Sequence, residues 1–188
     1  MITYEVNKAD LAFVRKKLQG LGTKGPRVIA KAINYTAVDA VRQLAHGAQT
    51  TYTVKVKGFQ SGMNIKKANA GNLVAIIKST DRPIRLTGYT HRGGVKKKGG
   101  KGASAQVLVG GSLKEIVNGS GIKAFKKNGQ ILQRKGKESY PLRVMFSNSV
   151  PKMIEKVYKG ERGANKAIRQ TINDQLHKHI SQEVAKLL

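Results

Sequence analysis

The chain has 188 residues, and its 36 Lys and Arg outnumber its 10 Asp and Glu to give a formal net charge of +26. This length suits one domain, or one domain with an appendage, and is enough to bury a hydrophobic core. The absence of cysteine excludes disulfides, thiol nucleophiles and iron–sulfur clusters, and the longest apolar run, residues 73–77, is too short to span a membrane.

The first 25 residues are interpreted as an N-terminal extension. They lack the apolar stretch of a secretory signal, and Asn7 or Asp10 can cap a short helix that ends before the glycine at position 20. A longer helix over residues 26–48 begins at Pro26, because proline is favoured at the first helical position. Its apolar residues recur at three- and four-residue spacing, which predicts one buried face.

Residues 50–146 favour β structure, with short stretches in which apolar and polar residues alternate. The clearest signal is a hairpin, because Asn128 and Gly129 supply the two positive-φ residues of a tight turn. The strands of this hairpin are residues 122–125 and 130–133, the other predicted strands are residues 73–77, 84–86, 107–109 and 142–146, and residues 51–56 form either a strand or the exit from the long helix.

The chain returns to helical patterns over residues 149–188. Ser149 can cap a short helix, and a last helix is predicted from Arg162 to Leu188. We expect its apolar stripe to pack on the residue 29–44 helix of the same subunit, with a neighbouring subunit as the alternative. The expected fold is a single α+β domain, with helices at both chain ends packed on a small antiparallel sheet and a mobile basic Gly/Lys loop.

Half of the net charge lies in the middle of the chain, where residues 82–137 contain 14 Lys and Arg against one acid, Glu115. Here residues 92–105 form a Gly- and Lys-rich loop, which has too little apolar surface to order itself. A chain this basic attracts polyanions, with nucleic acid as the first candidate and an acidic protein surface as the second. The candidate contacts are Arg92, Lys96, Lys97, Lys98 and Lys101 in the loop, and Arg82, Arg85, Lys123, Lys126, Lys127, Arg134 and Lys135 in a further basic patch.

Spacings that support catalysis or cofactor binding are missing from the sequence. Gly100 stands where a phosphate-binding loop needs lysine. His177 and His179 would point about 200° apart on a helix, and the ten acids are too scattered to hold a divalent ion. We therefore expect no catalytic residues, no metal site, no cofactor and no enzymatic activity. With 5% aromatic residues, any nucleic-acid binding is expected to be directed at phosphates and independent of sequence.

Several short segments follow one another in a characteristic order over most of the chain. They are Ala32-Ile33-Asn34, Arg82-Pro83-Ile84-Arg85-Leu86, the Gly/Lys/Arg-rich loop at 92–102, Ala124-Phe125, Asn128-Gly129, Gln133-Arg134, Tyr140-Pro141-Leu142, and Val150-Pro151 before a basic C-terminal helix. In the order and spacing of these segments, the chain resembles minor tail protein Z of long-tailed bacteriophages.

This resemblance implies a non-enzymatic structural protein of a virion or prophage that completes the head-proximal end of a phage tail. It implies a hexameric ring at the head–tail junction, stacked against tail-tube, tail-terminator or neck and connector proteins, around the channel for double-stranded DNA. The implied location is the virion tail or neck, after assembly in the bacterial cytoplasm and without membrane contact. In such a ring the basic loop faces either the DNA or an acidic surface of a neighbouring tail protein. The alternative function is a non-specific nucleic-acid-binding protein of the nucleoid or ribosomal type.

Overall fold

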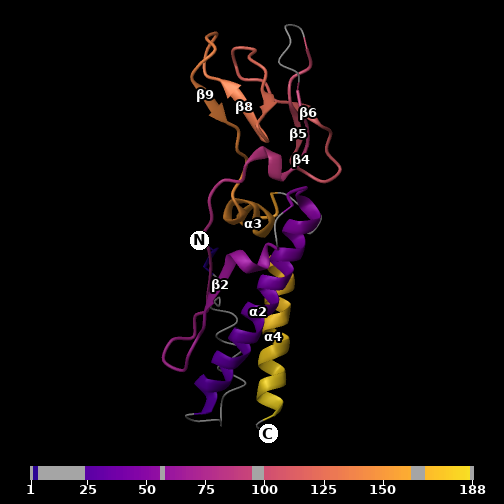
Figure 1. Ribbon diagram of the computed structural model, residues 1–188. Coiled ribbons are helices and arrows are strands. Elements are labelled where there is room, and N and C mark those ends of the chain that lie inside the picture. The colour runs from indigo at the N-terminus through magenta and orange to yellow at the C-terminus, as the bar shows by residue number, and fades with distance from the viewer. Residues whose placement is uncertain (1, 4–23, 56–57, 95–99, 162–167, 187–188) are drawn as a thin grey trace.

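The computed structural model describes residues 2–3, 24–55, 58–94, 100–161 and 168–186, and it has two clearly different parts (Figure 1). One part, which we call the helical body, consists of helices α2 (Gly25–Thr51), α3 (Val150–Tyr158) and α4 (Ile168–Ala185). The other part, the β head, consists of residues 84–147 and lies at the end of the molecule opposite the C-terminus (Figure 1). The structure is therefore α+β, as predicted from the sequence.

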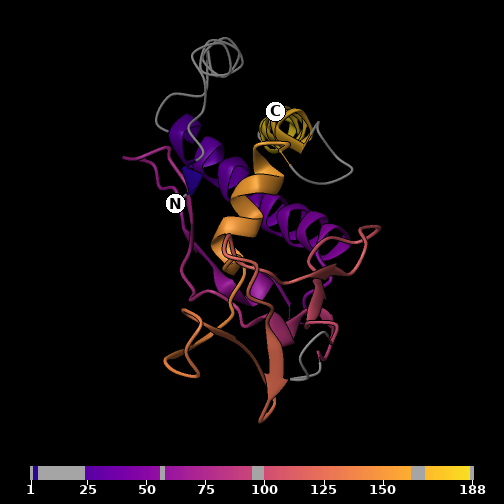
Figure 2. The same ribbon diagram turned by 90° about the horizontal axis from the view of Figure 1, so that it is seen from above.

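Helices α2 and α4 lie side by side and form the long axis of the molecule (Figures 1 and 2). Pro26 lies in the first turn of α2, where a missing backbone N–H costs nothing because that group has no partner within a helix. The predicted apolar stripe of α4 is buried: Ile168, Ile172, Leu176 and Ile180 are each at most 2% exposed. The predicted packing of the two helices within one subunit is confirmed.

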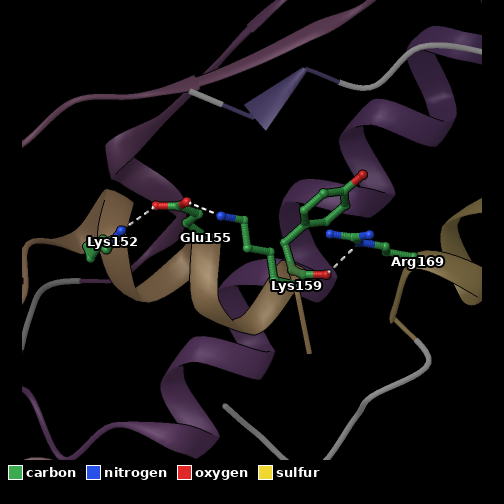
Figure 3. Close-up of polar contacts among 5 residues, drawn as sticks. Lys152, Glu155, Lys159 and Arg169 are labelled. Carbon is green, nitrogen blue, oxygen red and sulfur yellow. Dashed lines mark hydrogen bonds and ion pairs between the residues drawn. The ribbon is translucent and has the colours of Figure 1, made fainter. Parts of the chain in front are cut away.

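Helix α3 joins the β head to α4, and its one acid, Glu155, is paired with two lysines (Figure 3). The Glu155 carboxylate lies between Lys152 and Lys159, with 3.1 Å between the Lys152 Nζ and Glu155 Oε2 atoms. Arg169 donates from Nε to the Tyr158 carbonyl at 3.0 Å and stacks on that ring. Ser149 occupies the N-cap position of this predicted short helix, but its side chain makes no capping hydrogen bond, so the expected capping by the side chain is wrong.

A three-stranded antiparallel sheet lies beside α2, in the order β1 (Ile2–Thr3), β3 (Ile76–Ser79), β2 (Met63–Lys66). The predicted strand at residues 73–77 thus begins three residues later than expected. Asn34 connects the long helix to this region, because its side-chain amide donates to the Ala68 carbonyl at 3.0 Å and accepts from the Ala68 N–H at 2.8 Å. This pair of bonds satisfies both peptide groups of a buried residue.

The β head contains two further three-stranded antiparallel sheets. Their strands are β4 (Thr90–Arg92), β5 (Ser104–Gln106) and β6 (Lys114–Glu115) in one sheet, and β7 (Phe125–Lys127), β8 (Gln130–Arg134) and β9 (Leu142–Val144) in the other. Short 3₁₀ turns, Gln60–Gly62 and Leu86–Gly88, precede β2 and β4 respectively. A backbone bond of 2.7 Å from the Ala103 N–H to the Ala124 carbonyl ties the two sheets together.

The predicted hairpin is confirmed, since Asn128 and Gly129 have φ angles of 48° and 69° between β7 and β8. The stretch at 107–109 is not a strand. It keeps only one bridge, between Leu108 and Tyr52, because the chain turns at Gly110. The strand expected at residues 142–146 ends at Val144, and Phe146 forms one isolated bridge to Arg85.

Other sequence predictions lie wholly or partly outside the described residues. These are the short N-terminal helix after Asn7 or Asp10, the ends of the last helix at residues 162–167 and 187–188, and the centre of the Gly/Lys loop at residues 95–99. Arg92 ends β4 and Ser104 begins β5, so the ends of the predicted loop belong to a sheet.

Tyr89 anchors the β head on the helical body. Its ring is 2% exposed, and its hydroxyl donates to the Asn148 carbonyl at 3.0 Å, just before α3. The same hydrophobic cluster contains Leu44 of α2 and Met153 of α3. A separate cluster runs along α2 and α4 toward their far ends. No helix within the described residues is long and apolar enough to cross a membrane.

Candidate nucleic-acid interface

Positive charge is concentrated in the β head. Residues 84–147 contain 14 Lys and Arg against two acids, Glu115 and Glu138, whereas the three helices contain seven Lys and Arg against four acids. In the helices, each acid has a polar partner: Asp39 contacts His179, Asp174 contacts Gln170, Glu155 contacts two lysines, and Glu183 also contacts two lysines. Among the residues that the structure describes, the head has a single ion pair, Lys123–Glu115. Its remaining positive charge is available to an external anion.

Strands β4 and β7 lie next to each other although they belong to different sheets. The Lys126 Nζ is 3.1 Å from the His91 Nε2, and the other ring nitrogen of His91 is 2.9 Å from the Tyr89 carbonyl oxygen. An ammonium group is only a donor and a carbonyl only an acceptor, so His91 carries its proton on Nδ1 and accepts from Lys126 on Nε2. This contact brings Lys126 beside the end of β4.

A carboxylate lies within this basic surface. Glu115 Oε1 is 3.3 Å from the Lys123 Nζ and accepts a hydrogen bond from the Gly102 N–H. The Gly102 hydrogen bond, together with nearby Lys123 and Lys101, lowers the pKa of Glu115 below its usual value, so this side chain is ionised at neutral pH. Lys123 also reaches the Gly100 carbonyl at 3.4 Å. The start of β5 is thereby held against β6 and the segment before β7.

Glycine is required on both sides of the predicted basic loop. A Cβ on Gly94 would lie 2.1 Å from the Ala103 backbone nitrogen, and a Cβ on Gly102 would lie 2.9 Å from the Lys123 Cβ and 3.2 Å from the Ala124 carbonyl oxygen. The distance at Gly94 is too short for any side chain, and the distances at Gly102 are tight enough that its neighbours would have to shift to admit one. The two glycines therefore allow the chain before and after residues 95–101 to meet.

Four of the predicted contacts lie on the backbone segments that meet around this point, and we call them the basic junction. They are Arg92 at the end of β4, Lys101 before β5, Lys123 before β7 and Lys126 within β7, and all four are exposed. Lys96, Lys97 and Lys98 lie outside the described residues. The basic junction thus comes from three segments that are distant in sequence.

The remaining predicted contacts that the structure describes are Lys127, Arg134 and Lys135 at the ends of β7 and β8, and Arg82 and Arg85 before β4. Lys127 follows Lys126 at the end of β7, and Arg134 and Lys135 come at the end of β8. The preceding residue, Gln133, donates to the Ile122 carbonyl at 2.8 Å, which places the end of β8 near Lys123. Arg82 and Arg85 lie before β4, where Arg85 pairs with Phe146 beyond β9.

Sequence reasoning missed two side chains of this surface. His91 orients Lys126, as described above, and Arg143 of β9 donates from Nε to the buried Gln133 side chain at 3.1 Å. Alternation in the predicted strand at 142–146 placed Arg143 on the polar face, which was the available signal. Nothing in the local sequence relates His91 to Lys126, because 35 residues separate them.

The described residues include no group of three or more His, Cys, Asp or Glu side chains able to hold a metal ion. His179 is instead 2.9 Å from Asp39, which joins α4 to α2. The side chains of the basic junction are Lys and Arg, which attract anions and donate hydrogen bonds to them.

Comparison with known proteins identifies the family. No curated protein and no solved structure matches the chain. The family model described as prophage minor tail protein Z (GPZ) matches residues 13–188, which include the whole β head and the three helices. The chain therefore belongs to the prophage minor tail protein Z family, whose members are structural proteins of phage tails.

Proposed function

We propose that this protein completes the head-proximal end of a phage tail, as a hexameric ring around the DNA channel, and that its β head contacts the DNA backbone. It performs no catalysis and takes no cofactor in this proposal. Membership of the minor tail protein Z family supports the tail location. The observation that carries the DNA contact is the basic junction, in which Arg92, Lys101 and Lys126 are exposed around a single ion pair.

The basic junction suits DNA that must be held without being read. Lysine and arginine attract phosphates whatever the base sequence, and the affinity comes largely from release of counterions. The described head offers no run of exposed aromatic side chains for stacking on bases: Phe125 and Tyr89 are buried, and the exposed Tyr140 and Phe146 are six residues apart in sequence. A ring repeats the basic junction in every subunit, so the modest positive charge of one chain is multiplied around the DNA channel.

One observation favours the acidic face of a neighbouring tail protein as the second candidate partner. Leu113 and Val117, on either side of Glu115, are 44% and 43% exposed. Apolar side chains next to a charge pair are typical of protein interfaces, and phosphates make no use of them. This partner remains the alternative to DNA for the same part of the head.

The test is DNA binding by a variant in which Arg92, Lys101, Lys123 and Lys126 are all changed to Gln. Loss of four phosphate contacts should weaken binding to a short mixed-sequence duplex on the order of a thousandfold near 0.1 M salt. The slope of log affinity against log salt should fall by about 3.6, or about 0.9 for each contact.

A matched variant changes Arg27, Lys66, Lys156 and Lys178 to Gln, which removes the same charge outside the β head. It should retain the slope of the unmodified protein. Equal losses in the two variants would mean that net charge, and not the basic junction, carries the binding.

The ring is tested separately, by light scattering of the purified protein at low and high salt and by complementation of a phage lacking the gene. We expect a closed ring that survives high salt. We also expect the variant with the four Gln substitutions in the head to assemble virions that cannot eject their DNA. Normal DNA ejection by that variant would favour the alternative, in which the basic junction binds the acidic face of a neighbouring tail protein. A salt-sensitive monomer that binds DNA and does not complement would favour the nucleoid or ribosomal type of function.

A further inference from the structure

Glu115 forms the one ion pair found among the described residues of the β head, although its own charge opposes anion binding. A carboxylate on a surface that attracts phosphates repels them, so Glu115 on its own lowers the affinity for a polyanion. In residues 82–137 it is nevertheless the one acid among 14 Lys and Arg. The position of Glu115 suggests a structural role that offsets its repulsion of phosphates.

Glu115 lies where three backbone segments meet. The Ala103 N–H donates to the Ala124 carbonyl at 2.7 Å, the Ile116 N–H donates to the Ala103 carbonyl at 2.9 Å, and the Ala124 N–H donates to the Ile116 carbonyl at 2.8 Å. The segments before β5, after β6 and before β7 thus form a closed triangle of backbone bonds. Glu115 immediately precedes Ile116 at one corner of this triangle.

The Glu115 carboxylate extends the triangle to the basic side chains. It accepts from the Gly102 N–H, which directly follows Lys101, and it pairs with Lys123 at 3.3 Å. Gly102 is buried and tightly packed against Lys123 and the Ala124 carbonyl, so its N–H has little freedom to find another partner. An unpaired buried N–H is costly. One carboxylate therefore satisfies this N–H and fixes Lys123 at the same time.

We propose that Glu115 is a positioning residue of the basic junction, which holds Lys101 and Lys123 in place so that their charges reach one anion together. This inference rests on the proposed function of that surface. It predicts an effect of opposite sign to simple electrostatics: truncating the Glu115 side chain, and with it the acceptor for the Gly102 N–H, weakens binding to a polyanion although a negative charge is removed. Preorganised donors bind better because less conformational freedom is lost on binding.

The experiment compares three variants of the full chain in binding to a short duplex DNA. Glu115→Ala should bind about five- to tenfold more weakly, with a salt slope lower by about 0.9, because one phosphate contact is lost. Glu138→Ala removes the same charge from the turn between β8 and β9 and should bind about twofold more tightly. Glu115→Gln keeps an oxygen acceptor for the Gly102 N–H and should restore binding at least to that of the unmodified protein.

A fourth variant tests the same geometry without changing charge. In Gly102→Ala the added Cβ would press on the Lys123 Cβ and the Ala124 carbonyl, and it should weaken DNA binding as Glu115→Ala does. Thermal unfolding confirms that each variant is folded, and hydrogen exchange of the Gly102 amide reports its bond to Glu115. That exchange should be faster in Glu115→Ala and unchanged in Glu138→Ala.

The outcomes separate this inference from the proposed function. If Glu115→Ala binds DNA as tightly as Glu138→Ala, or if its Gly102 amide is still protected, the positioning role is refuted while the DNA contact stands. If the unmodified protein shows no salt-dependent DNA binding, the proposed DNA contact is refuted. Gly102 exchange then decides the positioning role alone, with protection retained in Glu115→Ala counting against it.

Discussion

The helical body and the β head use charge in opposite ways. In the body, three of the four helix carboxylates contact basic side chains, as Glu183 does with Lys31 at 2.8 Å and with Lys186, and Asp174 accepts from Gln170. In the described part of the head, one carboxylate pair lies among many cations without acidic partners. The comparison teaches that one chain can separate a scaffold whose acids are paired from a surface whose many cations have few acidic partners.

The hydrophobic core follows the same division. Helices α2 and α4 bury a continuous stripe, with Ile33, Leu176 and Ile180 each at most 1% exposed. The head has short strands whose outward positions are basic, such as Lys126 and Lys127 in β7. The buried apolar side chains of the body therefore stabilise the fold, while the exposed basic side chains of the head are available for binding.

The largest effect is expected from breaking the core of the body. Leu176 is completely buried between α4 and α2, and Leu176→Ala should lower the free energy of unfolding by about 2–5 kcal/mol through lost burial and a cavity. Urea unfolding measures this change, with Gln182→Ala on the exposed side of α4 as control. DNA affinity of the folded fraction should not change, and a loss there would contradict the separation of the two parts.

A smaller loss is expected where α2 meets the loop after β2. Asn34→Ala removes both hydrogen bonds to the Ala68 peptide groups, and it should cost about 1–3 kcal/mol because those buried groups lose their partners. The control is Asn64→Ala, since Asn64 is exposed on β2. Unfolding midpoints that agree for the two variants would show that the Asn34 bonds contribute nothing.

A single substitution in the head should affect binding but hardly affect stability. Lys126→Gln should weaken binding to duplex DNA about eightfold near 0.1 M salt, with a salt slope lower by about 0.9. Lys178→Gln on α4 carries the same change of charge and should leave affinity and slope unchanged. Titrations at several salt concentrations separate the two, and an equal loss in both variants would erase the contrast between head and body.

The smallest effect concerns acid stability of the body. Pairing with Lys159 and Lys152 lowers the pKa of Glu155 from 4.5 to about 2. A carboxyl whose pKa is lower in the folded state adds stability above its unfolded pKa and loses it as the pH falls toward its folded pKa. Unfolding temperatures of Glu155→Gln and the unmodified protein should therefore differ slightly above pH 4.5 and converge by about pH 2. A difference that persists there would point to a cause other than ionisation.

The sequence predicted the helices well because their signals are local. Pro26, the four-residue spacing of Ile168, Ile172 and Leu176, and the Asn128-Gly129 turn each act within a few residues of the chain. Strand ends were predicted less well. Residues 73–77 and 107–109 have the composition of strands, but whether they pair depends on partners elsewhere, and Leu108 finds only Tyr52.

The residues of the basic junction could be predicted only in part from the sequence. Composition identified Arg92, Lys101, Lys123 and Lys126 as candidates together with many other cations. It did not show which of them are neighbours, or that Glu115 lies among them. Asn34 appeared only as part of a family segment, and its role became clear from its bonds to Ala68, 34 residues away.

By itself, the sequence determined the charge, the apolar faces of the helices and the tight turn, because these depend on residue type and short spacing. The tertiary structure alone decided that β7 lies beside β4, that Gly102 packs against Lys123, and that one carboxylate joins them. The physical reason is that these contacts depend on backbone hydrogen bonds between distant segments. Such bonds use the same N–H and C=O groups at every residue and leave no local mark in the sequence.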